Sequence, residues 1–242
     1  MTRQHDLAAA FVDLADSMVS GTEVFTFLHR LCCHAVDLLA VDAAGVMLAD
    51  ENDVLRAVAA SNEDTHLLEI IALQHHEGVC LDVFRAGEVG QASTVDTLEQ
   101  WPNFSKLAVD RGYGWCCGIP LRHAGEIIGA MNLFREKDAR LDDDDVRLAQ
   151  ALADVATVGL LQRRETTHAR KQAKQLQEAL DSRVLIEQAK GVLAGRLNIT
   201  PDEAFQVIRR EARNNNRKLH DLAREIVHGD KDTVTRFVRQ RR

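Results

Sequence analysis

Basic and amide side chains gather toward the C-terminal end of the sequence, where they could bind a polyanion. Lysine and arginine side chains donate to phosphate oxygens, and asparagine side chains hydrogen bond to base edges. Single-stranded loops of RNA present both kinds of partner. The residues that supply these groups are Lys190, Arg209, Arg213, Asn216 and Lys218.

Two glycines, Gly191 and Gly195, lie in the same region and are four residues apart. Because glycine has no Cβ atom, each allows another backbone to approach closely. The spacing does not distinguish an RNA strand from a second helix as the approaching partner. Gly191 is therefore a candidate RNA-binding residue, with the helix–helix alternative left open.

Charge separates this C-terminal part from the rest of the chain. Residues 183–242 hold 14 Lys and Arg against 8 Asp and Glu, a net charge of +6. The whole chain of 242 residues has a net charge of −7, so residues 1–182 carry −13. A basic segment behind an acidic body indicates a polyanion partner for the C-terminal part alone.

A second group of chemically active side chains, Trp115, Cys116 and Cys117, lies in a short apolar stretch that predicts a strand. Adjacent residues of a strand point to opposite faces, so a ligand or an oxidant in a pocket would meet only one of the two thiols. The five cysteines of the chain show no CxxC spacing. The sequence therefore predicts no zinc site and no disulfide framework, and we expect no metal and no cofactor.

The segments that must position these groups alternate between helical and strand patterns. Apolar residues at helical spacing predict two helices within residues 7–38, interrupted at Gly21. Short apolar runs separated by turns predict hairpins over residues 41–61 and 115–135, with a helix over 63–76 between them. Together they predict an α+β domain, with an antiparallel sheet of five or six strands flanked by helices.

Glycines and a proline punctuate the chain between these two hairpins. Gly78, Gly87 and Gly90 interrupt the helical pattern, which predicts a surface loop. The pair Trp101-Pro102 is expected to anchor this loop against the domain.

A long helix is predicted to begin at Asp142, whose carboxylate can cap its N-terminus. The apolar residues Ala173, Leu176 and Leu180 then follow at the spacing of a coiled-coil seam. We therefore expect a connecting helix that pairs with a second copy of the chain, giving a homodimer.

Three apolar stripes at helical spacing predict a small three-helix module at the C-terminal end. Thr200, Pro201 and Glu203 match the capping box that opens its second helix, in which Phe205 is expected to face the core. The predicted organisation is a domain with an N-terminal helix over residues 1–161, a helical linker or coiled coil over 162–182, and a basic module with a basic tail over 183–242.

The composition is typical of a folded protein in water, with 45% hydrophobic and 28% charged residues. No apolar run approaches the ~20 residues that span a bilayer, and the first residues include acidic ones where a signal peptide is apolar. We expect a cytoplasmic protein with no membrane partner.

The motifs EQAKGVL, PDEAFQVIRREA and NRKLHDLAREIV follow one another in the basic module. In this order and spacing they resemble the ANTAR domain, a bacterial RNA-binding antitermination module, over residues 183–228. The resemblance implies a three-helix bundle that binds paired RNA stem-loops as a dimer and prevents a transcription terminator from forming. The sequence departs from the family at Glu211, where many relatives have an aromatic or basic residue.

The larger domain resembles the GAF domain, a sensory fold, over residues 22–161. The resemblance rests on GIPLRHAGEIIGAMNLF, HHEGVCLDVFRAGEV and EQWPNF. It implies that a small ligand or a signalling protein acts on this domain, or that the domain serves to dimerise the chain. The signature of cyclic-nucleotide-binding members is not visible.

We therefore predict a regulator, not an enzyme, in which a GAF domain controls RNA binding by an ANTAR domain. Three alternatives stay open. The C-terminal helices could form a DNA-binding helix-turn-helix. Cys116 or Cys117 could be an enzyme nucleophile with a histidine as base. The first domain could also be a redox-gated or protein-gated adaptor that binds no small molecule.

Overall fold

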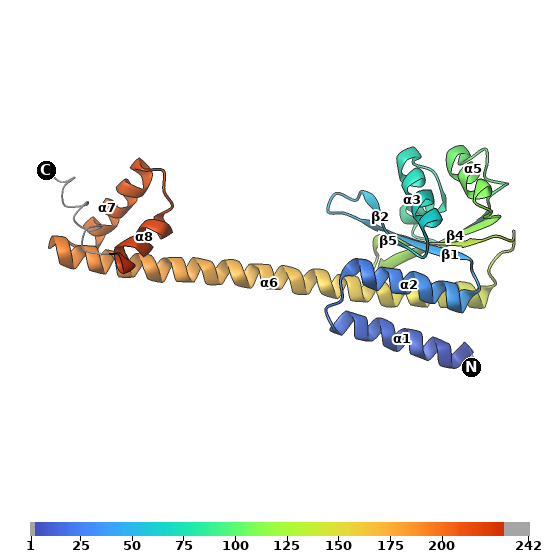
Figure 1. Ribbon diagram of the computed structural model, residues 1–242, viewed down its shortest axis with the longest axis horizontal. Helices are drawn as coiled ribbons and strands as arrows, with labels where there is room; N and C mark the ends of the chain where they lie inside the picture. The colour runs from blue at the N-terminus through green and yellow to red at the C-terminus, as the bar shows by residue number, and fades with distance from the viewer. Residues whose placement is uncertain (1–2, 230–242) are drawn as a thin grey trace. The chain divides into compact units, whose positions relative to one another are not determined.

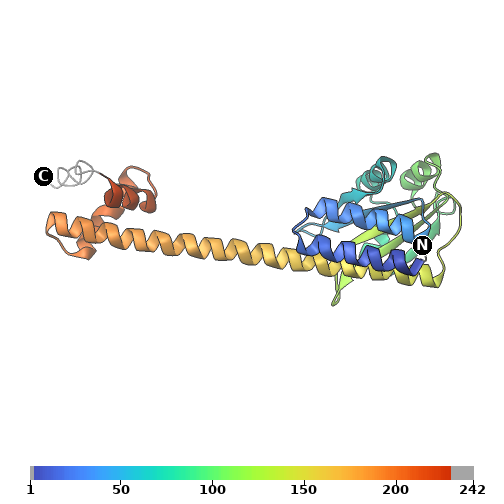
Figure 2. The same cartoon turned by 60° about the horizontal axis from the view of Figure 1, so that its bottom comes forward.

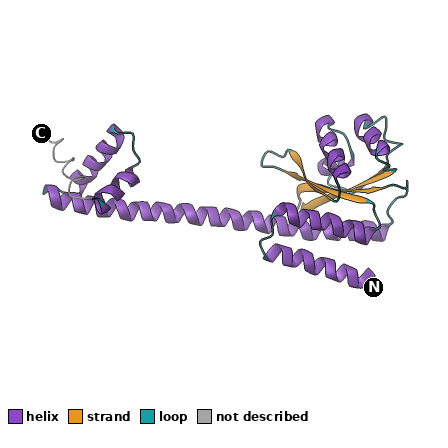
Figure 3. Cartoon of the chain, viewed as in Figure 1, coloured by secondary structure: helices purple, strands orange, loops and turns teal. Residues whose placement is uncertain are grey.

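The computed structural model describes residues 3–229 of the chain. The chain divides into two compact units, residues 1–165 and 166–242. All five strands of the described residues belong to the first unit, and the second is helical (Figure 3). The predicted basic tail after residue 229 lies outside the described residues.

The first unit is built on a five-stranded antiparallel sheet with the strand order β2-β1-β5-β4-β3. This confirms the predicted sheet of an α+β fold and both predicted hairpins. The strands are β1 (Ala43–Ala49), β2 (Leu55–Ala60), β3 (Gly90–Ser93), β4 (Trp115–His123) and β5 (Glu126–Arg135).

Helices cover both faces of this sheet (Figure 1). One face packs against α2 (Val24–Leu39) and the start of α6 (Asp143–Leu197), and α1 (Arg3–Val19) packs against α2 on the side away from the sheet. Figure 2 brings α1 and α2 to the front of the sheet. The other face packs against α3 (Glu63–His75), α4 (Val79–Ala86) and α5 (Pro102–Asp110).

The two hydrophobic cores follow from the alternation of side chains along each strand. In β1, Val46 and Leu48 belong to the core under α1, α2 and α6, while Met47 belongs to the core under α3, α4 and α5. Every residue of β1 is buried, as expected for a central strand that is covered on both faces.

Local chemistry explains how the hairpins turn. Ala124 and Gly125 both have positive φ, of 50° and 87°, as a two-residue hairpin loop of the primed type requires. In the other hairpin, the Asp50 carboxylate accepts from the backbone N–H groups of Asn52 (2.9 Å) and Val54 (3.2 Å). These bonds close the turn between β1 and β2.

The prediction of a surface loop around Gly78, Gly87 and Gly90 is wrong. Helix α4 lies between the first two glycines, which occupy its N-cap and its left-handed C-cap, and Gly90 begins β3. Helix α5 was also not predicted. Its N-terminus is capped by Glu77, whose Oε2 accepts from the backbone N–H groups of Asn103 (2.7 Å) and Phe104 (2.9 Å).

The long helix was predicted from its start, but its extent differs from the expectation. Asp142 Oδ1 accepts from the backbone N–H of Asp145 at 2.8 Å, as predicted for the N-cap. The helix then runs without interruption to Leu197, so the predicted linker and the first helix of the module are one element, α6.

The second unit packs the last turns of α6 against α7 (Pro201–Asn214) and α8 (Leu219–His228). The predicted capping box is present: Glu203 N–H donates to Thr200 Oγ1, and Thr200 N–H donates to Glu203 Oε2. The small core consists of Ala189, Leu193, Ala204, Ile208, Ala212, Leu222, Ala223 and Ile226.

Candidate functional site

Four of the predicted RNA-binding residues lie along one continuous segment, from the middle of α7 to the start of α8. Arg209 and Arg213 are exposed and one helical turn apart. Asn216 follows in the left-handed conformation (φ 49°), and Lys218 is the N-cap residue of α8. We call these four residues the basic patch. Their side chains form no hydrogen bond or ion pair with another described residue, so their donors are available to a ligand.

The fold holds the backbone of the basic patch in place. Glu211, next to the patch, is buried, with 9% of its surface exposed. Its Oε1 accepts from Asn215 Nδ2 at 2.8 Å, and the Arg217 N–H donates to Ala212 O at 2.8 Å. Glu211 therefore stabilises the end of α7, a structural role that explains a carboxylate among cations.

Lys190 lies apart from the patch and is already engaged. Its ammonium group donates to both carboxylate oxygens of Glu187, at 3.0 and 2.8 Å, and its side chain is 15% exposed. The same nitrogen lies 5.6 Å from the ring centroid of Phe205 on α7. Lys190 is thus brought close to α7, but its charge is partly neutralised within the protein.

Gly191 is exposed on α6, and a Cβ atom added there would meet no atom within 4 Å. The same holds for Gly195. Within the described residues, neither glycine is needed for packing. Each weakens a helix interior by about 1 kcal/mol relative to alanine, and the open space beside each leaves the backbone accessible.

The candidate signal residues of the first unit, Trp115, Cys116 and Cys117, are all fully buried. Cys116 faces the core under α3, α4 and α5, and Cys117 faces the opposite core, as the strand pattern predicted. Burial raises the pKa of the Cys116 thiol to about 12, and it also raises the pKa of Cys117. Both thiols are protonated near neutral pH, whereas a nucleophile needs the thiolate.

Trp115 has a packing role. Its ring lies 5.7 Å from the Arg135 guanidinium carbon. Arg135 in turn donates to the carbonyl of Leu39 at the end of α2. This contact ties the end of α2 to the sheet.

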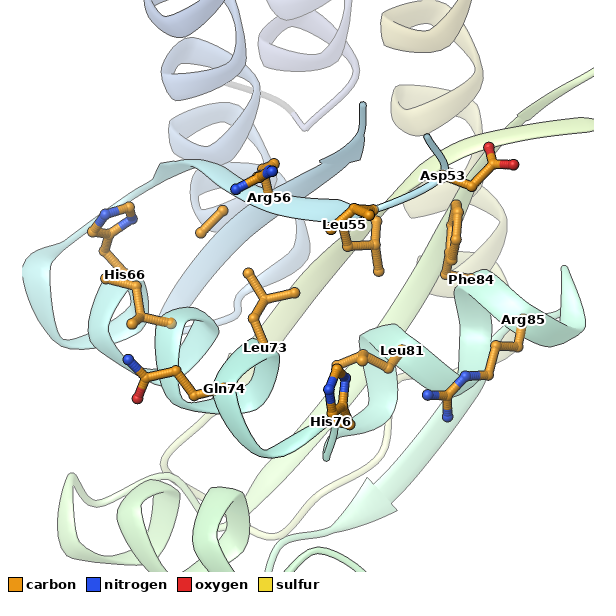
Figure 4. A pocket seen from close by; sticks show the side chains of 13 residues that line it. Asp53, Leu55, Arg56, His66, Leu73, Gln74, His76, Leu81, Phe84 and Arg85 are labelled. Carbon is orange, nitrogen blue, oxygen red and sulfur yellow. The ribbon is translucent and has the colours of Figure 1, made fainter. Parts of the chain in front are cut away.

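A cavity of about 760 Å³ lies in the first unit between the edge strand β2 and helices α3 and α4 (Figure 4). We call it the edge cavity. Leu55 and Leu73 point into it from opposite sides, and Phe84 closes one end (Figure 4). Its volume and its mostly apolar lining are those of a small-molecule site.

Polar groups line the rim of the edge cavity. They are Asp53, Arg56, His66, Gln74, His76 and Arg85. Two of the cations have acidic neighbours outside the cavity: Arg56 donates to Asp50 at 3.1 Å, and Arg85 donates to Asp82 at 3.3 Å. The rim can therefore orient the polar end of a ligand whose apolar part fills the interior.

The sequence contained one signal of the edge cavity that the prediction missed. Helix α3 buries Leu68 and Ala72 in the core. Ile70 and Leu73 form a second apolar stripe on the same helix, and both line the cavity. Two apolar stripes on one short helix indicate a second apolar environment beside the core.

An unusual carboxyl group is buried near the centre of the sheet. Glu69 on α3 is completely buried, and neither of its carboxylate oxygens has a hydrogen-bond partner within the described residues. Asn132 Oδ1 on β5 is likewise buried and unpartnered. Burial raises the pKa of Glu69 well above its usual range, and the neighbouring Asn132 opposes this only in part.

Two family models match the chain in succession. The GAF domain matches residues 22–160, and the ANTAR domain matches residues 174–227. No curated protein matches the chain. Among the described residues, no helix is long and apolar enough to cross a bilayer, and no group of three or more His, Cys, Asp or Glu is placed to hold a metal ion.

Solved structures share the fold of the first unit. The GAF domain of an Acinetobacter phosphoenolpyruvate-protein phosphotransferase superposes with a TM-score of 0.52 at 14% identity, covering 68% of this chain and 97% of that one. The corresponding GAF domain from Coxiella burnetii gives 0.51 at 12% identity, covering 69% and 99%. A free methionine-R-sulfoxide reductase from Neisseria meningitidis gives 0.52 at 16% identity, covering 68% and 91%.

Proposed function

Because this chain belongs to the GAF domain family and continues into an ANTAR domain, we infer that it is a signal-controlled regulator of transcription antitermination. In this proposal the ANTAR domain binds paired RNA stem-loops, so that a terminator hairpin does not form. The GAF domain receives the signal that controls this binding.

One observation carries the RNA-binding part of the proposal. The ANTAR match spans residues 174–227 and contains the whole basic patch, whose cations and amide are exposed and unpaired within the described residues. Exposed cations beside an exposed amide suit phosphate contacts combined with contacts to unpaired bases. No catalytic group is required for this function.

The direct test is a competition between a tandem-hairpin RNA and a duplex DNA of equal length for the full-length protein. The two nucleic acids are titrated over a salt series, and the oligomeric state is recorded at each point. Preference for the RNA by a dimer supports antitermination. Preference for the duplex would instead support the helix-turn-helix alternative.

The double substitution Arg209→Ala with Lys218→Ala is expected to lower the affinity for the tandem-hairpin RNA on the order of 100-fold. Each charge-assisted contact to phosphate contributes about 1.5 kcal/mol. The plot of log affinity against log salt should also become shallower by about 2, one for each lost contact. Gel-shift titrations at several salt concentrations measure both quantities.

The matched control is Arg170→Ala with Lys171→Ala, which removes the same charge from an exposed part of α6. Along α6, Lys171 lies about 30 Å from Lys190, because each residue adds about 1.5 Å to the length of a helix. Equal losses in the two double variants would show that only overall charge matters, and the assignment of the patch would then be wrong.

We further propose that the signal is a small molecule with an apolar body and a polar end, bound in the edge cavity. Support comes from the apolar interior and the polar rim described above. The buried residues Trp115, Cys116 and Cys117 do not line this cavity. Binding of the ligand biases the dimer toward the arrangement in which two ANTAR domains meet two hairpins.

The substitution Leu73→Trp is expected to fill the edge cavity and to weaken binding of the probe 1-anilinonaphthalene-8-sulfonate at least 10-fold. This probe has an apolar ring system and one sulfonate, which matches the cavity and its rim. Fluorescence titration measures the affinity, and near-UV circular dichroism verifies the fold. The control Leu67→Trp changes the same helix at a partly exposed position that does not line the cavity. Equal probe affinity in both variants would place the probe elsewhere.

A further inference from the structure

Phe205 is the only Phe, Tyr or Trp in residues 166–229, and its position does not match the prediction. It was expected in the core, but neither the buried core of the second unit nor the half-buried side chains packed against it include Phe205. The neighbouring Ala204 and Ile208 fill the core from α7 instead. The Phe205 ring is half-buried at the surface.

Two cationic residues, Lys190 and Arg209, belong to the surroundings of this ring. The Lys190 ammonium group lies 5.6 Å from the ring centroid and is held there by its ion pair with Glu187 (2.8 Å). Arg209 follows Phe205 by one helical turn on α7 and has no partner among the described residues. The ring therefore has a fixed ammonium group over it, and an unpaired guanidinium-bearing side chain follows one helical turn along α7.

A partly exposed aromatic ring with an unpaired arginine one helical turn away suits one kind of ligand particularly well. Aromatic side chains stack with unpaired bases, and cations beside them contact the adjoining phosphates. Bases inside a continuous duplex are stacked on each other and offer no free face. The ring thus favours an RNA in which at least one base is unpaired.

We propose that Phe205 is the platform on which an unpaired loop base of the RNA stacks, with Arg209 on the adjoining phosphate. This inference rests on the proposed RNA-binding function and extends it to a residue outside the basic patch. The Lys190–Glu187 pair positions the ring. Lys190 is thereby assigned to supporting the platform, in place of direct phosphate binding.

The first experiment compares Phe205→Leu with Phe205→Tyr in gel-shift titrations against the tandem-hairpin RNA. Removing one stacked base lowers affinity about 10-fold to 100-fold, so Leu is expected to show this loss and Tyr to bind as the native protein does. The dependence on salt should stay unchanged in Phe205→Leu, because no phosphate contact is removed. This separates stacking from the effect of Arg209→Ala, which makes the dependence shallower by about 1.

The second experiment uses the native protein, so that it does not depend on a variant that folds. Hairpins with 5-iodouridine at single loop positions are irradiated in the complex, and the cross-linked peptide is identified by mass spectrometry. A cross-link at Phe205 from a loop position is expected. Cross-links confined to other residues would overturn the platform.

The outcomes distinguish this inference from the proposed function. Native affinity in Phe205→Leu, with reduced affinity in the Arg209→Ala, Lys218→Ala variant, would refute the platform while RNA binding stands. Absence of hairpin binding by the native protein would refute both. Dissociation of a dimer by Phe205→Leu, measured by sedimentation, would show that the ring contacts a second copy of the chain and not RNA.

Discussion

Replacing Leu176 and Leu180 by Asp is expected to convert a dimer into a monomer and to lower the affinity for a tandem-hairpin RNA about 100-fold. Two linked binding events strengthen each other by a factor of 10² to 10⁴ when both sites can be occupied at once. A monomer loses that factor and keeps the affinity of one ANTAR domain. Binding to a single hairpin should therefore change little.

We expect this loss of the dimer because exposed apolar residues lie in the middle of α6. Residues 164–181 are all exposed, and Leu176 and Leu180 expose 65% and 49% of their surfaces. With Ala173 they form the seam expected of a coiled coil, and Val184 lies close to its continuation with 56% exposed. A second copy of the chain, which carries the same seam, is the occupant we propose. Two charges introduced on each helix would oppose one another across that seam.

Analytical ultracentrifugation measures the change of mass, and gel shifts with one and two hairpins measure the affinities. The control Gln175→Asp with Ser182→Asp adds the same charge to α6 on the side away from the seam. The dimer proposal fails if the seam variant keeps the native mass. It also fails if single-hairpin binding falls as much as tandem binding.

The second large effect concerns pH and the buried Glu69. Glu69→Gln is expected to make the first unit more stable than the native protein, by an amount that grows by about 1.4 kcal/mol for each pH unit above 4.5 until the folded pKa is reached. A protonated carboxyl can donate to Asn132 Oδ1 and accept from its amide, which satisfies the unpartnered oxygens. Glutamine preserves a neutral side chain of the same shape.

The sign follows from where the proton is bound. Because burial raises the folded pKa of Glu69, the folded chain keeps a proton that the unfolded chain loses above its ordinary value of 4.5. The contribution of this group to stability is therefore complete below pH 4.5. It declines as the pH rises toward the folded pKa. Glutamine does not titrate, so the variant lacks this decline.

Urea unfolding followed by tryptophan fluorescence, at several pH values between 5.5 and 8.5, measures the difference. Both tryptophans, Trp101 and Trp115, lie in the first unit, so the signal reports that unit. Glu99→Gln removes an exposed carboxylate and serves as the control. A constant difference between native protein and Glu69→Gln across this pH range would mean that Glu69 is ionised in the folded state.

Elements with local sequence signals could be predicted from the sequence, and elements capped by glycines or by a distant side chain could not. The two hairpins and the Thr200 capping box were predicted, because alternation and capping are local signals. Helix α4 has eight residues between Gly78 and Gly87, so its glycine caps resembled a loop. Helix α5 depends on Glu77, a capping side chain 25 residues before its first residue, Pro102.

The candidate functional site also has parts that could be predicted from the sequence and parts that could not. The exposed cations of the basic patch could be chosen from the sequence because exposure follows charge, although their role in RNA binding stays a prediction. The edge cavity could not, because it exists only where β2, α3 and α4 meet. Phe205 was misplaced because Ala204 and Ile208 already fill the core beside it, which a helical pattern alone does not reveal.

The strand order of the sheet also determines when each unit can fold. Strand β5 lies between β1 and β4, and the pairing of Gly45 with Asn132 joins residues 87 positions apart. The sheet cannot be completed until nearly the whole first unit has been synthesised, and such distant pairing folds slowly. In the second unit, α7 and α8 contact neighbours close in sequence, which favours rapid folding. On the ribosome, the helices of the ANTAR domain can thus form soon after they emerge, whereas the sheet of the GAF domain completes its pairing more slowly.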